Sequence, residues 1–322
     1  MFLGMAGCLS ARLKARNRRR GEGQVAWIKP MEPVHRTRVE EKGYWAQVKF
    51  DGVRLMAASR EGRVILYNRK GCDRTAHYPE LQSMKEIAQD FYLDGELIAP
   101  DGSGRPDFPT LIRRDLADPR RAAGLAPVIP IQYIPFDVLG WEGQWLLDRP
   151  IEERFEYLRN IPASPWVVPA QAWLNGAELL WAEVKQRELE GIVVKREGSP
   201  YVPGRASPLW QKVKHRRTLR VWVGGVVIRE GQVRSLCIGR KDEQGRLYYI
   251  GNVGSGLAAL DADVVIQGSR HLWRKDSPFV NQKDLPGIIF WEPELQADVE
   301  YAEWTPEGRL RQPSLKGFVS GH

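Results

Sequence analysis

The chain has 322 residues, of which 43% are hydrophobic and 27% are charged, which is typical of a globular protein of about two domains. No apolar run reaches the length of about 18 residues that a membrane-spanning helix needs, so the sequence excludes such a helix. Cys8, Cys72 and Cys237 lie far apart and form no Cys-x-x-Cys pair, which argues against a zinc site and a disulfide framework and favours a reducing cytoplasm.

The net charge of +8 is unevenly distributed along the chain. Residues 1–22 hold six cations and one anion, so we predict a basic flexible arm over residues 1–24. Residues 185–217 hold nine cations and three anions and predict a second basic zone, on the surface of the folded body. An arginine-rich arm commonly contacts nucleic-acid phosphates, and the same composition is equally typical of a solvated tail.

Residues 25–217 predict an α+β domain, because helices interrupt strands without a regular alternation of strand and helix. Turns at Asp51-Gly52 and Glu61-Gly62 separate the first three strands, which we expect to form an antiparallel meander. The expected strands are 44–49, 54–59, 64–68, 91–98, 131–138, 191–195 and 209–214. The expected helices are 79–89, 151–159 and 177–187.

Residues 218–322 show a different pattern, with strands expected at 220–229, 232–239, 247–253 and 299–304 and a helix near 257–272. Glu230-Gly231 and Gln244-Gly245 are typical of tight hairpin turns between such strands. We therefore predict a second domain over 218–322, a short β-barrel of the OB type.

Lys49 stands at the end of the expected strand 44–49, followed by Phe50, Asp51 and Gly52. A lysine amine can attack the α-phosphate of a nucleoside triphosphate and hold the nucleotide as a phosphoramidate, provided that its surroundings keep it unprotonated. The same Lys-x-Asp-Gly tetrapeptide is also typical of a solvated strand end with a turn after it. The residues that accompany Lys49 decide between the two interpretations.

Five further segments follow Lys49, and each holds a residue type that nucleotidyl transfer needs. They are Arg69 to Gly71, Asp94-Gly95-Glu96, Phe136-Asp137, Glu190-Gly191 leading into 192–195, and Lys212-Val213-Lys214. In order and spacing they resemble the covalent nucleotidyltransferase superfamily of ATP-dependent DNA ligases, RNA ligases and capping guanylyltransferases. Residues 199–205, 210–214 and 302–314 are similar to the ligase module of bacterial non-homologous end-joining proteins, so that the resemblance covers roughly residues 28–318.

The resemblance implies an ATP-dependent DNA ligase with an adenylation (nucleotidyltransferase) domain at 25–217 and an OB domain at 218–322. It makes Lys49 the residue that carries AMP, and it assigns Lys212 and Lys214 to the α-phosphate of ATP. Two residues apart on one strand, these lysines face the same way and disfavour the ammonium form of Lys49 by their like charge. Without this company they would indicate the solvated face of an edge strand.

The other implied roles belong to carboxylates, an aromatic residue and arginines. Glu96 and Glu190 lie beside glycines on otherwise apolar strands, where a charge is costly unless it is paired. The resemblance assigns Glu96 to the ribose and Glu190 to a catalytic Mg²⁺ or Mn²⁺. It places Phe136 on the adenine, Arg54 at the sugar and Arg69 at the 5′-phosphate of a nick. Taken singly, these residues equally indicate turn carboxylates, a core aromatic and surface ion pairs.

The sequence departs from the family pattern in two places. Gln47 replaces a glutamate that reads the adenine amino group, and its carbonyl oxygen can accept the same hydrogen bond without a charge. Val319-Ser320-Gly321-His322 stands where related modules have an Arg-x-Asp-Lys sequence that helps to orient pyrophosphate. Slow self-adenylylation is therefore expected, unless Lys316 takes over the role of the missing cation.

These patterns favour a three-step ligase that seals nicked or broken duplex DNA in repair. An RNA ligase, a capping-type enzyme and a catalytically impaired nick-binding protein are the alternatives. We expect a cytoplasmic, nucleoid-associated monomer, and the resemblance implies a Ku-like end-binding protein as a partner at breaks.

Overall fold

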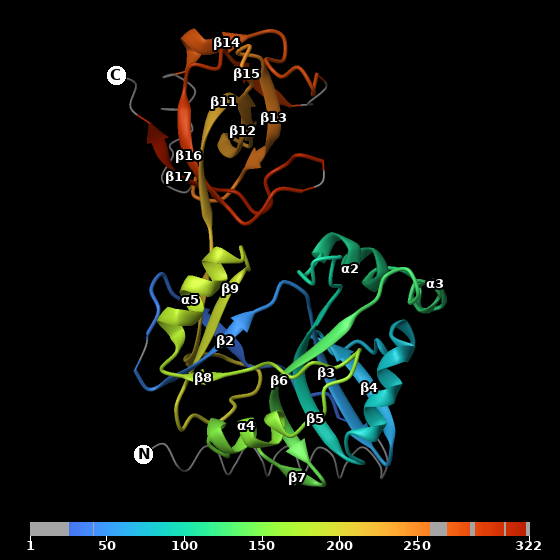
Figure 1. The fold of residues 1–322 in the computed structure, drawn as a ribbon. Helices are drawn as coiled ribbons and strands as arrows, with labels where there is room; N and C mark the ends of the chain where they lie inside the picture. Colours follow the sequence, from blue (N-terminus) through green and yellow to red (C-terminus); the bar gives the residue numbers. More distant parts are fainter. Residues whose placement is uncertain (1–25, 41, 258–268, 284–286, 306, 320–322) are drawn as a thin grey trace. The chain divides into compact units, whose positions relative to one another are not determined.

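The computed structural model describes residues 26–40, 42–257, 269–283, 287–305 and 307–319 (Figure 1). The predicted basic arm, most of the helix predicted near 257–272 and the last three residues of the chain lie outside this part. The chain divides into two compact units, with the boundary between His215 and Arg216.

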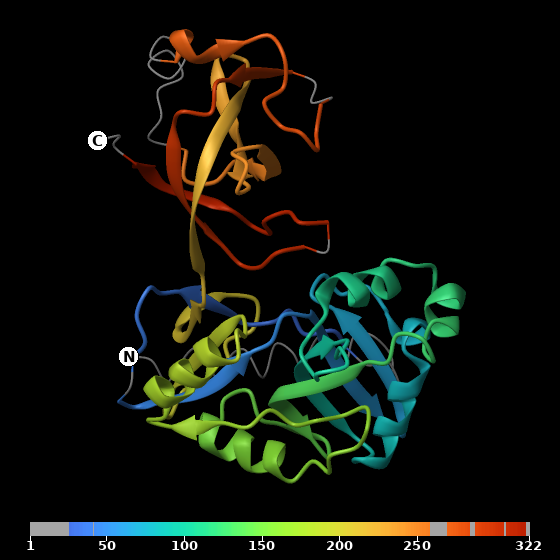
Figure 2. The same cartoon turned by 45° about the horizontal axis from the view of Figure 1, so that its top comes forward.

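The first unit contains two antiparallel-rich sheets, which form separate layers in both views (Figures 1 and 2). One sheet has the strand order β1-β10-β9-β2-β8, in which only the β1 to β10 pairing is parallel. Its strands are β1 (Glu32–His35), β2 (Tyr44–Lys49), β8 (Trp173–Leu174), β9 (Gly191–Arg196) and β10 (Ala206–Lys214). Helix α5 (Ala177–Gln186) covers one face of this sheet, where Ala46, Ile192 and Val194 pack against Leu180 and Val184.

The other sheet of this unit has the order β4-β3-β5-β6-β7. Its strands are β3 (Val53–Arg60), β4 (Arg63–Asn68), β5 (Phe91–Ile98), β6 (Gln132–Trp141) and β7 (Gln144–Trp145). The helices beside it are η1 (Thr75–His77), η2 (Pro79–Glu86), α2 (Phe108–Asp115), α3 (Pro119–Gly124) and α4 (Ile151–Arg159). They bury its outer face in the largest apolar cluster of the unit, in which Leu81 of η2 and Phe155 of α4 are almost fully enclosed.

The predicted meander of the first three strands is wrong, because β2 pairs with β8 and β9 and only β3 pairs with β4. Asp51 and Gly52 carry the chain from one sheet to the other instead of reversing it. Gly52 passes so close to β5 that a Cβ atom there would collide with the Leu97 carbonyl oxygen. A turn signal locates the break between strands but carries no information on which partner each strand takes.

The helices show two further differences from the prediction. The segment predicted as a helix at 79–89 is the 3-10 helix η2, and α2 and α3 were not predicted. Both missed helices follow an aspartate whose side chain caps the first turn: Asp107 accepts from the Thr110 amide and Asp118 from the Arg121 amide. In both helices a proline occupies one of the first two helical positions, and an aspartate close to a proline in the sequence resembles a loop.

The second unit is built on one antiparallel sheet with seven strands. They are β11 (Arg217–Arg229), β12 (Gln232–Lys241), β13 (Leu247–Val253), β14 (Trp273–Arg274), β15 (Ile288–Trp291), β16 (Gln296–Tyr301) and β17 (Ser314–Val319). A short 3-10 helix, η3 (Arg270–Leu272), precedes β14. On the side away from β12, the first half of β11 pairs with β16 and its second half pairs with β15. The core of this unit contains Val223, Leu236 and Trp291. The predicted α+β fold with a second, OB-type β domain is confirmed.

None of the helices in the described part of the chain combines the length and the apolar character that crossing a membrane requires.

Gly191, at the start of β9, is a position where the fold requires glycine. It lies between Lys49 on β2 and Lys214 on β10 in the strand register. A Cβ atom at this position would collide with the Val213 carbonyl oxygen, and the backbone φ of +155° is one that other residues rarely adopt.

Replacing this glycine by alanine therefore should destabilise the first unit by about 1–3 kcal/mol, since overpacking costs about that much. Urea unfolding of the full chain measures the effect, with Gly102→Ala, where a Cβ meets nothing within 4 Å, as the matched control. Equal unfolding midpoints for Gly191→Ala and Gly102→Ala would contradict the packing described here.

Candidate functional site

A cavity of about 740 Å³ lies between the two sheets of the first unit. The sheet that α5 covers contributes its other face to this cavity. That face carries Gln47 and Lys49 on β2, Val193 and Lys195 on β9, and Trp210, Lys212 and Lys214 on β10. Arg54, Glu96 and Phe136 line the cavity from the opposite sheet.

The strand register explains why these residues meet. Val193 pairs with Gln47 on one side and with Lys212 on the other, and Gly191 pairs with Lys49 and Lys214 in the same way. Because side chains alternate between the faces of a strand, residues at every second position of three paired strands share one face. The residues between them, such as Val48 and Ile192, pack under α5. The predicted common orientation of Lys212 and Lys214 is therefore observed.

Glu190 lies directly before β9 and receives two cations. Lys49 Nζ lies 2.7 Å from Glu190 Oε2, and Lys214 Nζ lies 3.0 Å from Glu190 Oε1. All three side chains are largely but not fully buried, so that these contacts are less screened than surface ion pairs. One carboxylate thus holds two lysine side chains that line the cavity.

Lys212 lies beside this group and has no carboxylate within ion-pair distance in the described part of the chain. Burial lowers the pKa of Lys212, and the nearby charges of Lys49 and Lys214 lower it further. The three lysines together form a positive wall, which favours a ligand with a dense negative charge.

Gln47 is almost completely buried behind the same wall. Its Nε2 atom donates to the Phe136 carbonyl oxygen at 3.4 Å. Its Oε1 atom is buried and has no hydrogen-bond partner among the described residues. Burying an acceptor without a donor costs free energy of folding. The Gln47 Oε1 atom is therefore suited to accept a hydrogen bond from an N–H group of a ligand.

The opposite wall is organised by the buried carboxylate of Asp94. Arg54 forms two hydrogen bonds to it, of 2.9 Å from Nε and 2.6 Å from Nη2. The Tyr201 hydroxyl donates to the same carboxylate at 2.7 Å. These bonds fix the guanidinium group of Arg54. Its central carbon lies 5.3 Å from the ring centre of Phe136, so Arg54 limits the positions that this ring can take.

Glu96 lies next to Arg54 in the register of β3 and β5. It forms no ion pair or hydrogen bond with the other described residues. Burial raises the pKa of Glu96 to about 8, with Glu190 and Asp94 adding to this effect, although Lys49 and Arg54 oppose it. With this pKa, the Glu96 carboxyl group holds a proton at neutral pH and can donate a hydrogen bond.

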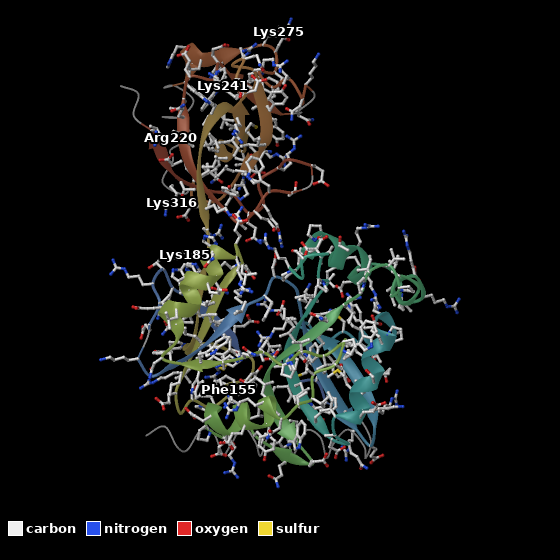
Figure 3. All side chains as sticks on the ribbon, in the orientation of Figure 1. Phe155, Lys185, Arg220, Lys241, Lys275 and Lys316 are labelled. Atoms are coloured by element: carbon white, nitrogen blue, oxygen red, sulfur yellow. The ribbon has the colours of Figure 1, made fainter. Side chains whose placement is uncertain are left out.

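Arg69 differs from the other predicted residues, because its side chain is 67% exposed at the rim of the cavity. Its Nε lies 2.7 Å from Glu32 Oε1, so it takes part in an ion pair. Lys316, on β17 of the second unit, pairs with Glu300 at 3.0 Å and is largely exposed (Figure 3).

The prediction of a basic surface over 185–217 is wrong for three of its cations. Lys195 is 1% exposed, and Lys212 and Lys214 line the cavity. Lys195 lies 3.6 Å from Asp137, which Arg154 also holds with two hydrogen bonds. Burial is the main cause that lowers the pKa of Lys195 to about 8.

Sequence reasoning included Lys195, Asp94 and Asp137 in its motifs but gave them no role. Alternation along β9 was the signal that could have assigned Lys195 to the cavity. It lies two residues from Val193 and therefore on the same face of the sheet as Lys49, Lys212 and Lys214.

Comparison with known families gives two matches that together cover most of the chain. The model of an ATP dependent DNA ligase domain matches residues 29–214, and that of an ATP dependent DNA ligase C terminal region matches residues 229–319.

Individual relatives agree with these matches. The chain is 35% identical over 303 residues to the multifunctional non-homologous end joining DNA repair protein LigD of Mycobacterium tuberculosis, covering 90% of the chain and 38% of that protein. It is 32% identical to LigD of Pseudomonas aeruginosa, covering 94% of the chain and 37% of that protein. A solved structure of mycobacterial DNA ligase D complexed with ATP and MES is 32% identical, with a TM-score of 0.54, and the match covers 91% of this chain and 95% of that one.

The unusual pKa of Glu96 predicts a dependence of stability on pH. Between about 4.5, its ordinary value, and about 8, the folded protein holds a proton that the unfolded chain releases. The contribution of this group to stability therefore is present below pH 4.5 and falls as pH rises towards 8.

Glu96→Gln removes this contribution, so its free energy of unfolding relative to the wild type should increase steadily from pH 5 to pH 8. Urea titrations at several pH values measure the difference, and Glu86→Gln, which changes an exposed carboxylate on η2, is the control. A difference that stays constant over this range would show that Glu96 titrates normally.

Proposed function

Because the chain belongs to the family of ATP-dependent DNA ligases, we propose that it seals 5′-phosphate/3′-hydroxyl interruptions in duplex DNA through a lysyl-AMP at Lys49 and a DNA-adenylate. The observation that carries this proposal is that Lys49 and Lys214, each bound to one oxygen of Glu190, line the same cavity as Lys212. The family uses ATP together with a divalent metal ion.

In the first step, Lys49 Nζ attacks the α-phosphorus of ATP. A nitrogen–phosphorus bond forms, the bond from that phosphorus to the bridging oxygen breaks, pyrophosphate leaves and the amine loses a proton to solvent. Lys212 and Lys214 stand on the neighbouring strand, where their charges offset the negative charge that develops on the phosphoryl oxygens. In the following steps the nucleotide passes to the 5′-phosphate, and the 3′-hydroxyl then displaces AMP.

Glu190 has two uses in this scheme. Its carboxylate holds the side-chain nitrogen of Lys49 at 2.7 Å. If Glu190 instead held a metal ion that arrives with the nucleotide, Lys49 would lose this partner and its amine would be free to attack.

The donor set suits a metal that arrives with the nucleotide. No group of three or more metal-binding side chains is present in the described ranges, and Mg²⁺ commonly binds one or two carboxylates together with substrate phosphates. Bound there, Mg²⁺ or Mn²⁺ would neutralise phosphate charge, with Glu190 as its protein ligand.

The rest of the cavity suits the nucleoside. The buried Gln47 Oε1 accepts from the amino group of adenine, the ring of Phe136 stacks on the base, and Glu96 and Arg54 face the ribose. Arg69, exposed at the rim, has the fork geometry to hold the 5′-phosphate of the nick once Glu32 releases it.

We also propose that the chain acts in double-strand break repair with a Ku-like end-binding protein. The support is that the relatives above carry non-homologous end joining in their names. The chain spans 38% of the length of the Mycobacterium tuberculosis relative, so the other activities of such proteins are not attributed to it.

Lys49→Arg tests the nucleophile most sharply, because it keeps a positive partner for Glu190 but replaces the amine by a guanidinium that stays protonated. With α-labelled ATP and Mg²⁺, the wild type should form a covalent label and Lys49→Arg should form none. Sealing of a pre-adenylylated nick should persist in the variant, since that step needs no lysine nucleophile.

Lys85→Arg, an exposed lysine on η2, is the control and should label like the wild type. Absence of label in the wild type, together with failure to seal a pre-adenylylated nick, would indicate a nick-binding protein instead. Sealing of RNA nicks only would indicate an RNA ligase.

The partner hypothesis predicts a difference between two DNA substrates. A Ku-like protein should increase joining of blunt breaks by about tenfold or more, because it raises the effective concentration of the ends, and should leave nick sealing unchanged. Gel assays with both substrates measure this, and equal effects on the two would contradict a specific role at breaks.

A further inference from the structure

Lys195 is a buried cation that the three-step scheme leaves unused. Its Nζ lies 4.1 Å from the ring centre of Trp210, 4.8 Å from that of Phe136 and 5.3 Å from that of Phe155. Phe155 comes from α4 (labelled in Figure 3), whereas Lys195 and Trp210 belong to the lysine-bearing sheet. Aromatic rings thus enclose Lys195 on several sides, which compensates part of the cost of burying its charge.

Charge balance does not by itself explain this lysine. Asp137, its anionic neighbour at 3.6 Å, already accepts two hydrogen bonds from Arg154, of 2.7 and 3.1 Å. Arg154 is fully buried and also donates to the carbonyl oxygens of Arg149 and Ser199. Asp137 therefore keeps a strong partner without Lys195.

The shortest contact of Lys195 is with the backbone beside the cavity. Its Nζ donates to the Phe136 carbonyl oxygen at 2.8 Å, and Gln47 Nε2 donates to the same oxygen at 3.4 Å. A carbonyl oxygen has two lone pairs and can accept both bonds. Lys195 and Gln47 come from one sheet and Phe136 from the other, so this oxygen links the two walls of the cavity.

The shared carbonyl also decides which end of the Gln47 amide remains for a ligand. Two acceptors repel one another, so the amide nitrogen turns towards the Phe136 carbonyl and Oε1 is left as a buried acceptor without a partner among the described residues. If the carbonyl moved away, the amide could rotate and present its N–H₂ group instead.

We propose that Lys195 is a positioning residue that sets the nucleobase preference of the cavity, by holding the Phe136 carbonyl so that Gln47 presents an acceptor to the base. This inference rests on the proposed function, in which the base of ATP enters beside Phe136. The site then selects a purine with an amino group at position 6 over a purine with a carbonyl at that position, which would meet Gln47 Oε1 as a second acceptor.

Pre-steady-state labelling of the full chain with ATP and with ITP tests the proposal. The wild type should prefer ATP by at least about 100-fold in kcat/KM, because a site built around a hydrogen bond rejects an analogue that cannot make it. Lys195→Met keeps an unbranched chain in the aromatic enclosure and should reduce this preference about tenfold, mainly by raising KM for ATP.

A double-variant cycle separates positioning from general damage. Gln47→Leu should reduce the preference at least as much as Lys195→Met, and the double variant should lie no lower than Gln47→Leu alone, because Lys195 acts through Gln47. Lys185→Met, an exposed lysine on α5 (Figure 3), is the control and should keep the wild-type preference.

Equal losses with ATP and ITP in Lys195→Met, or additive losses in the double variant, would overturn the proposal. If Lys195→Met does not fold, Gln47→Leu decides by itself, since an unchanged preference for ATP in that variant also overturns it. Failure of the wild type to label with either nucleotide would instead refute the proposed function.

Discussion

The ion pairs of Glu190 are the interaction on which the cavity depends. Lys49 and Lys214 occupy the two oxygens of one carboxylate, and Gly191, the residue after Glu190, lies between these lysines in the strand register. Breaking such a largely buried arrangement by removing the anion would leave two like charges close together. In the proposed function, a metal ion held by Glu190 would replace these lysines on the carboxylate.

Buried charges, and not apolar packing alone, hold the residues around the cavity. Asp94 on β5 fixes Arg54 and Tyr201, and Asp137, its register partner on β6, fixes Arg154 and Lys195. Each carboxylate accepts at least two charged or hydroxyl donors, which meets the condition that makes a buried charge tolerable. Side chains that are already fixed in this way need little ordering when a ligand binds, which favours a ligand that fits the cavity as it stands.

Much of this could be predicted from the sequence. Strand periodicity located β2, β5, β9 and β10, and spacing gave Lys212 and Lys214 a common orientation. The resemblance to covalent nucleotidyltransferases placed Lys49 beside them. The pairing of β2 could not be predicted, because Asp51-Gly52 has the composition of a hairpin turn, and only the pairing of β2 with β8 and β9 shows where the chain goes. Lys195 was missed for a related reason: a lysine in a basic stretch indicates a surface until its strand partners are known.

The position of the covalent bond tests the central claim most directly. After incubation of the full chain with ATP and Mg²⁺, digestion and peptide mass spectrometry locate any bound AMP. We predict a single adduct on the peptide that contains Lys49, formed through an acid-labile nitrogen–phosphorus bond. An adduct on Lys195, Lys212 or Lys214, or no adduct while nicks are nevertheless sealed, would contradict the assignment of Lys49 as the nucleophile.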